Sequence, residues 1–112
     1  MSQLTTHILD TTLGKPAVGV SILLLQKVKD EWVTLAQGKT NADGRISDLL
    51  RPEIVLEKGV YRMTFDTGNY FKNQNVVTFY PVVTVEFEVN DATHYHVPLL
   101  LNPFGYSTYR GS

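Results

Sequence analysis

The sequence has 112 residues, a length that fits a single domain, 1–112, built around one hydrophobic core. It contains no cysteine, which excludes disulfides, cysteine-based metal sites and a thiol nucleophile. Ten basic and eleven acidic residues give a net charge of -1 without a basic run, which argues against a nucleic-acid partner.

The amino-terminal residues do not resemble a targeting signal. They lack a basic segment followed by a long apolar one, so we expect no secretory signal peptide. The longest apolar run, residues 22–25, is far too short to cross a bilayer. We therefore expect a cytoplasmic protein with no membrane partner.

The first third of the chain alternates between apolar and polar residues, as strands do. Residues 5–10 predict a short strand, which ends at a turn over residues 13–16. Residues 18–25 predict a second strand, apolar on both faces, and such a strand is central in a sheet or lies in a subunit interface. A hairpin tip at residues 29–31 leads into a third strand over residues 32–40.

The middle of the chain continues this pattern and adds a short helix. Asn, Asp and Gly within residues 40–45 predict a turn, and residues 45–49 a short strand after it. Residues 60–66 alternate cleanly and predict another strand. Residues 67–75 lose the alternation and predict one short helix, capped by the Asp or Thr at its start.

The last third holds the clearest strand, residues 83–89, in which Val and Phe alternate with Thr and Glu. A strand over residues 94–101 follows, then a turn at residues 102–103 and a last short strand at residues 108–110. Seven or eight strands with turns every eight to twelve residues predict an all-β protein, an antiparallel β-sandwich. The tail after the turn carries tyrosines and an arginine, so we expect it to be docked on the domain.

The three histidines are the side chains whose charge changes most easily near neutral pH. His94 and His96 lie two residues apart, so on a strand they project from the same face. The pair fits two solvent-facing histidines, and it also fits zinc ligands with His7 as the third. His7 itself, on the first strand, fits a structural or a catalytic role.

Positive charges that could bind an anion lie at two places. Arg45 directly follows Asp43-Gly44, where it either aids solubility or grips a planar anion through paired hydrogen bonds. Arg110 and the carboxylate of Ser112 either pair with neighbours or close a site.

Common catalytic signatures are missing from the sequence. It has no Gly-x-Ser-x-Gly elbow, no Gly-x-Gly-x-x-Gly and no P-loop, so we expect neither an acyl-enzyme serine nor a nucleotide cofactor. Histidine, arginine and hydroxyl groups remain. That set suits acid–base activation of water on a carbonyl, with a cation stabilising the oxyanion.

Four motifs, in this order, resemble the 5-hydroxyisourate hydrolase family, also called transthyretin-related proteins. They are His-Ile-Leu-Asp-Thr with Gly-Lys-Pro-Ala at residues 7–17, Asp-Gly-Arg at 43–45, His-Val-Pro-Leu-Leu-Leu at 96–101 and Tyr-Arg-Gly-Ser at 109–112. The resemblance runs from residue 4 to residue 112. Asn102 stands where the family usually has Ser before the proline of the last turn.

The resemblance implies a transthyretin-like sandwich of two four-stranded sheets with one short helix, assembled as a homotetramer, a dimer of dimers. It implies a catalytic site of His7, Arg45, His96 and Ser112, with Tyr109 and Arg110 binding substrate and with no metal or other cofactor. His94 lies outside the matched motif and is treated as peripheral.

The activity that the resemblance implies is hydrolytic opening of 5-hydroxyisourate to 2-oxo-4-hydroxy-4-carboxy-5-ureidoimidazoline in urate breakdown. Two alternatives stay open at this point. One is a transthyretin-like carrier of a hydrophobic ligand without catalysis, and the other is a zinc hydrolase using His7, His94 and His96.

Overall fold

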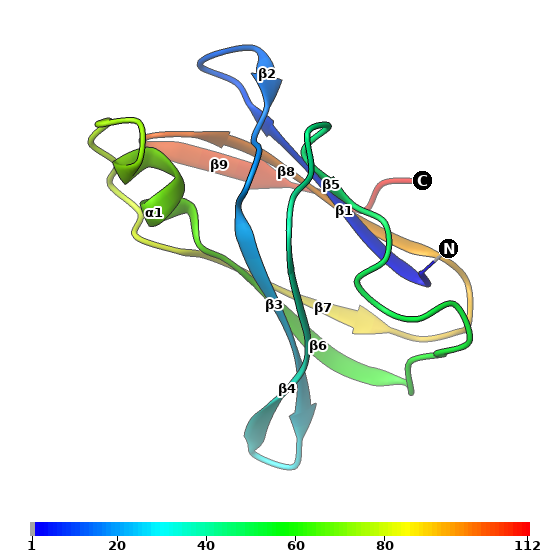
Figure 1. The fold of residues 1–112 in the computed structure, drawn as a ribbon. Helices are drawn as coiled ribbons and strands as arrows, with labels where there is room; N and C mark the ends of the chain where they lie inside the picture. Colours follow the sequence, from blue (N-terminus) through cyan, green and yellow to red (C-terminus); the bar gives the residue numbers. More distant parts are fainter. Residues whose placement is uncertain (1) are drawn as a thin grey trace.

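The computed structural model describes residues 2–112 and consists of two β-sheets packed face to face, with one short helix at an end of the sandwich (Figure 1). The first sheet contains β1 (Leu4–Asp10), β2 (Lys15–Pro16), β5 (Arg45–Ile46), β8 (Tyr95–Asn102) and β9 (Gly105–Thr108). The second contains β3 (Ser21–Val28), β4 (Glu31–Lys39), β6 (Gly59–Phe65) and β7 (Val83–Val89). The predicted all-β sandwich with one helix is confirmed.

The first sheet differs from the prediction in two respects. It has five strands, not four, because the two-residue strands β2 and β5 both pair with the same edge of β1. On the other edge of β1 lies β8, and this pair is parallel, whereas the remaining pairs are antiparallel. The parallel register places Thr5 opposite His96 and His7 opposite Pro98.

The second sheet has the order β4-β3-β6-β7 and is antiparallel throughout. The strand that is apolar on both faces, β3, lies between β4 and β6, so within the chain it is a central strand. On its inner face Ile22 and Leu24 are buried, whereas Leu23 on the outer face is 37% exposed.

The core lies between the sheets and follows the predicted alternation. Tyr61, Met63 and Phe65 of β6 are all fully buried. They meet the inward side chains of the first sheet, among them Leu4 and Ile8 of β1, which are also fully buried. Two-residue alternation thus sends one set of side chains of each strand into the core and the other set outward.

The helix α1 (Thr67–Lys72) lies within the predicted segment, and Asp66 caps it by accepting a hydrogen bond from the amide of Asn69 at 3.4 Å. The helix is tied to β1, because the Tyr70 hydroxyl donates to Oδ2 of buried Asp10 at 2.8 Å. Burial and this bond raise the pKa of Tyr70 to about 12. Asp10 thus makes its contact on the inner face of β1, whereas His7 lies on the opposite face.

Several boundaries differ from the sequence-based expectation, and the strand predicted over residues 18–25 is Ser21–Val28. The turn after β1 covers residues 11–14, and Lys15–Pro16 already pair with β1. The strand expected over residues 45–49 is only Arg45–Ile46. The last strand is Gly105–Thr108, not 108–110, because the two-residue turn at 103–104 returns the chain at once onto β8.

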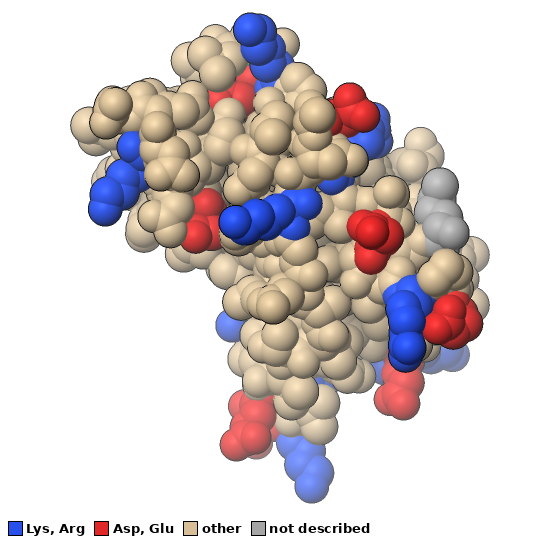
Figure 2. Space-filling view, in the orientation of Figure 1, with Lys and Arg blue, Asp and Glu red and all other residues tan. Residues whose placement is uncertain are grey.

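The surface shows no large patch of one charge on the face drawn in Figure 2, where Lys and Arg alternate with Asp and Glu. This agrees with the balanced composition. Over residues 2–112, no helix has the length and apolarity needed to cross a membrane.

Candidate active site

The outer face of the first sheet gathers three of the predicted site residues. On β1, Thr5 and His7 point outward, since the residues between and around them face the core. The register pairs His7 with Arg45 of β5 on one edge, and Thr5 with His96 of β8 on the other. His7, Arg45 and His96 therefore share one face of three neighbouring strands.

Arg45 is held by the tight turn that precedes β5. The side-chain oxygen of Asn41 accepts hydrogen bonds from the amides of Asp43 at 2.9 Å and Arg45 at 3.0 Å. Gly44 has a positive φ of 71°, and a Cβ there would lie 2.6 Å from the carbonyl oxygen of Ile8. Only glycine fits this position, so the Asp-Gly-Arg motif fixes where the arginine side chain starts.

A hollow of about 280 Å³ opens on this face. The residues that line it are Thr5, Thr6, Arg45, Ile46, Ser47, His94, His96 and Ser112. The tail reaches it because the Gly111 amide donates to the carbonyl of His96 at 2.9 Å, and the chain ends beside β1 and β5 (Figure 1). Arg45, His96 and Ser112 are thus brought together, whereas His7 pairs with Arg45 across the strands but is not among the residues that line the hollow.

Thr5 belongs to this cluster, although the sequence analysis did not single it out. Its hydroxyl lies 2.8 Å from Nδ1 of His96 and 2.9 Å from Nε2 of His94. The alternation of β1 already placed Thr5 on the face of His7, but only the pairing of β1 with β8 shows which histidines it meets. His94, expected to be peripheral, lines the hollow through this contact.

The environment favours neutral imidazoles. Burial lowers the pKa of His7, and the charge of Arg45 lowers it further, while Asp43 opposes both effects. Burial also lowers the pKa of His96, helped by the charges of Arg45, His94 and His7, while a hydrogen bond with the Thr5 backbone opposes these effects. Both rings are therefore largely unprotonated at neutral pH and able to accept a proton.

Tyr109 and Arg110 line a second hollow, of about 270 Å³, between β7 and the β8–β9 pair. The Arg110 guanidinium lies 4.2 Å from the centre of the Tyr95 ring and donates to the carbonyl of His94 at 3.3 Å. Tyr109 is 60% exposed. Arg110 therefore anchors the tail at this hollow, which Tyr109 also lines, and His96 borders both hollows.

The three histidines are not arranged as a metal site. The zinc alternative needs His7, His94 and His96 to converge, yet no group of three or more His, Asp or Glu residues within 2–112 is placed to hold a metal ion. Nδ1 of His96 and Nε2 of His94 face the Thr5 hydroxyl instead. Their geometry suits hydrogen bonding.

Comparison with known proteins gives the family. Residues 4–111 match the HIUase/Transthyretin family. The chain is 50% identical over 110 residues to 5-hydroxyisourate hydrolase of Salmonella typhimurium, covering 97% of this chain and 80% of the relative. The chain therefore belongs to the HIUase/Transthyretin family.

Two solved structures show the range of this family. The 5-hydroxyisourate hydrolase of Klebsiella pneumoniae is 38% identical with a TM-score of 0.86, covering 97% of this chain and 98% of its own. Sea bream transthyretin in complex with thyroxine is 37% identical with a TM-score of 0.92, covering 98% of this chain and 95% of its own. The same fold thus occurs in a 5-hydroxyisourate hydrolase and in a thyroxine-bound transthyretin, so the residues of the site must distinguish the two.

Proposed function

We propose that this protein is a 5-hydroxyisourate hydrolase, which opens the oxidised purine ring to 2-oxo-4-hydroxy-4-carboxy-5-ureidoimidazoline in urate breakdown. The observation that carries the proposal is the cluster of His7, Arg45 and His96 on one outer sheet face. The identity to the Salmonella enzyme supports it. A carrier of an apolar hormone has no need of such a cluster.

The hydrolysis requires a base for water and a cation for the oxyanion. One imidazole, of His7 or His96, accepts a proton from water as the oxygen attacks the C6 carbonyl. The other imidazole orients the water or protonates the leaving nitrogen when the ring C–N bond breaks. The lowered pKa of both histidines supports the base role, because only the neutral ring has a free lone pair.

Arg45 supplies the positive charge in this mechanism. It lies at the strand start next to His7, and it forms no ion pair with any residue of the range 2–112. A guanidinium free of a carboxylate partner can hold the substrate oxygens and stabilise the tetrahedral oxyanion.

The tail completes the site in this proposal. Ser112 contributes to substrate contact, since it lines the hollow together with Arg45 and His96. Tyr109 and Arg110 contribute to substrate binding by holding that tail and, in an assembled protein, by bordering the site.

We further propose that the chain works as a homotetramer, a dimer of dimers. The hollow is open to solvent on one side, and a second copy over this sheet face would exclude water from it. An exposed apolar patch beside the turn at 103–104 supports association; it contains Phe79, Phe104 and Tyr106. Patches of this kind commonly mark interfaces, and sedimentation would measure the assembly.

The test follows freshly generated 5-hydroxyisourate by ultraviolet absorbance with and without the protein. Faster decay with the protein, undiminished by a strong chelator, is the expected result. Decay at the uncatalysed rate would favour the second candidate function, a ligand carrier. The similarity to the thyroxine-bound sea bream structure is the observation that supports this alternative. Thyroxine binding without hydrolysis would establish that alternative.

A further inference from the structure

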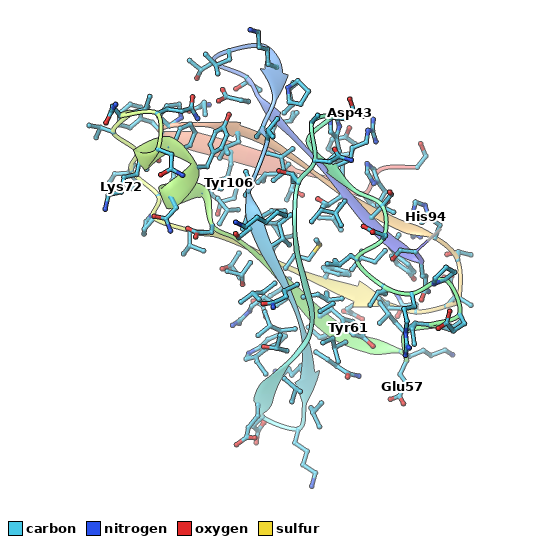
Figure 3. All side chains as sticks on the ribbon, in the orientation of Figure 1. Asp43, Glu57, Tyr61, Lys72, His94 and Tyr106 are labelled. Atoms are coloured by element: carbon cyan, nitrogen blue, oxygen red, sulfur yellow. The ribbon has the colours of Figure 1, made fainter. Side chains whose placement is uncertain are left out.

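His94 and His96 are connected through a single buried hydroxyl. Thr5 is only 7% exposed, and its Oγ1 lies within hydrogen-bond distance of both rings, at 2.9 Å from Nε2 of His94 and 2.8 Å from Nδ1 of His96. The two rings lie nearly parallel, with their centres 6.3 Å apart. His94, labelled in Figure 3, directly precedes β8, and its backbone carbonyl accepts a hydrogen bond from Arg110 of the docked tail.

A hydroxyl has one proton, and this links the protonation of the two rings. If Thr5 donates to His94, then Nδ1 of His96 carries a proton and donates to Thr5, which leaves Nε2 of His96 with a free lone pair. If His94 donates to Thr5, the hydroxyl donates to Nδ1 of His96, and the proton of the neutral ring moves to Nε2. Only the first arrangement makes Nε2 of His96 a base.

We propose that His94 is a positioning residue that, through Thr5, fixes the tautomer of His96 and receives the proton that His96 removes from water. The proposal rests on the function proposed above and assigns the base to His96. It also gives a defined part in the reaction to Thr5, which the sequence analysis did not single out, and to His94, which the hydrolase motifs left outside the site.

The proton transfers balance. Water gives a proton to Nε2 of His96 as its oxygen bonds to the substrate carbonyl carbon. Nδ1 of His96 gives its proton to Oγ1 of Thr5, and the Thr5 hydroxyl proton passes to Nε2 of His94. The reverse sequence returns the proton to the leaving nitrogen as the C–N bond breaks, and the three side chains regain their starting state.

The surroundings of the pair suit a shared proton. Positive charges of Arg45, His7 and His94 all act against a proton that stays on His96. The titratable and charged groups around His94 are His96 through Thr5, Arg45 across the hollow, and Arg110, which donates to the carbonyl of His94 and acts in turn on the Asp91 carboxylate. On its other side His94 borders a hollow whose remaining lining is uncharged; it consists of Ser2, Gln3, Pro52, Ile54, Val55 and Ala92.

The kinetic test uses three variants of the full chain. Thr5→Val removes the hydroxyl at nearly constant side-chain shape. It should lower kcat about 10- to 100-fold, which is at or below the lower end of what a general base contributes. KM should change little. Thr5→Ser keeps the hydroxyl and should recover most of the turnover. His94→Gln keeps a polar group near Thr5 but does not titrate, so kcat should fall and the acid limb of the kcat profile should change shape.

Thr34→Val is the matched control, because Thr34 is exposed on β4 of the other sheet. Its turnover should equal that of the unmodified protein. An equal loss in Thr34→Val and Thr5→Val would mean that the effect is not specific to the relay and would overturn it.

A second measurement needs no substrate. Long-range nitrogen–proton NMR correlations distinguish the two tautomers of a neutral imidazole, and His96 should carry its proton on Nδ1. In Thr5→Val the two tautomers should mix, whereas Thr5→Ser should keep the first. A His96 ring protonated on Nε2 in the unmodified protein would contradict the proposal.

The outcomes separate the two proposals. If the unmodified protein hydrolyses 5-hydroxyisourate while Thr5→Val and His94→Gln keep full turnover, the relay is wrong and the hydrolase remains. If the unmodified protein does not accelerate the reaction, the proposed function fails, and the relay, which rests on it, fails with it.

Discussion

The outer faces of the two sheets each carry a strand arginine, and the two arginines differ in their partners. Arg62 on β6 lies 3.9 Å from the centre of the Trp32 ring and forms an ion pair with Glu86 at 3.5 Å. Arg45 on β5 faces His7 and forms no ion pair within residues 2–112. The charge of Arg62 is paired within the protein, whereas the charge of Arg45 is available to a ligand.

This difference separates a structural arginine from the arginine that we propose to act in the reaction. A stacked and paired guanidinium gives a modest stabilisation, of order 1 kcal/mol, and has little capacity left for an anion. An unpaired guanidinium beside two neutral imidazoles contributes little to stability. Its position after a tight turn suits a reaction in which a negative charge develops beside it.

The largest expected effect comes from the imidazoles of the first sheet. His7→Asn or His96→Asn should lower turnover of 5-hydroxyisourate by about 10² to 10⁴-fold, the range of a positioned general base. Because both rings are only partly buried at an outer face, the fold and assembly should persist. Initial rates and sedimentation measure the two properties, and near-normal turnover in His96→Asn would remove His96 from the mechanism.

The second prediction compares the two arginines directly. Arg45→Gln should lower kcat by about 10² to 10³-fold, as loss of an oxyanion donor does, with little change in unfolding free energy. Arg62→Gln, the matched control, should leave turnover unchanged and lower stability by about 1 kcal/mol or less. Kinetics and urea unfolding of both variants check this, and equal activity losses would show that the pairing of an arginine does not predict its role.

The third prediction concerns the tail, whose Gly111 amide donates to the carbonyl of His96 on the first sheet. A Cβ on Gly111 would lie 2.6 Å from Cδ2 of His96, so Gly111→Ala must shift the tail or the ring. Turnover should fall roughly tenfold, because small misplacements of reacting groups are costly. At Gly105 an added Cβ meets nothing closer than 3.7 Å, so Gly105→Ala is the control and should keep its activity. Comparable rates for the two variants would mean that tail placement is unimportant.

The sequence predicted the sandwich because alternation is a local property. The inward residues of β6 and β7 and the capped helix could be identified from neighbouring residues alone. The boundary of β9 was missed, since the length of the preceding turn decides where pairing restarts.

The site could be predicted less completely, for a different reason. The parallel pairing of β1 with β8 joins residues about ninety positions apart, as in the contact of Thr5 with His94 and His96. Alternation shows that Thr5 and His7 share a face, but it contains no information on register between distant strands. Motif resemblance supplied His7, Arg45 and His96 and could not supply the hydroxyl between the histidines.

The smallest expected effect is on protonation. Arg45 lowers the pKa of both His7 and His96, so Arg45→Gln should raise both pKa values toward the ordinary value of about 6.5. Arg62→Gln should leave them unchanged. The C2-proton signals of the histidines in an NMR titration measure this without substrate.

The free energy of unfolding should depend on pH for the same reason, the lowered pKa values of the two histidines. The pKa values of His7 and His96 are lowered in the folded state, so below about pH 6.5 the unfolded chain binds more protons than the folded chain. The free energy of unfolding should therefore decrease as the pH falls from about 6.5 through the folded-state pKa values. In Arg45→Gln this decrease should be shallower, because the folded and unfolded pKa values lie closer together. Urea unfolding at a series of pH values tests it. A pH dependence equal in both arginine variants would mean that Arg45 does not act on the histidines, and the contrast between the two sheet faces would lose its electrostatic basis.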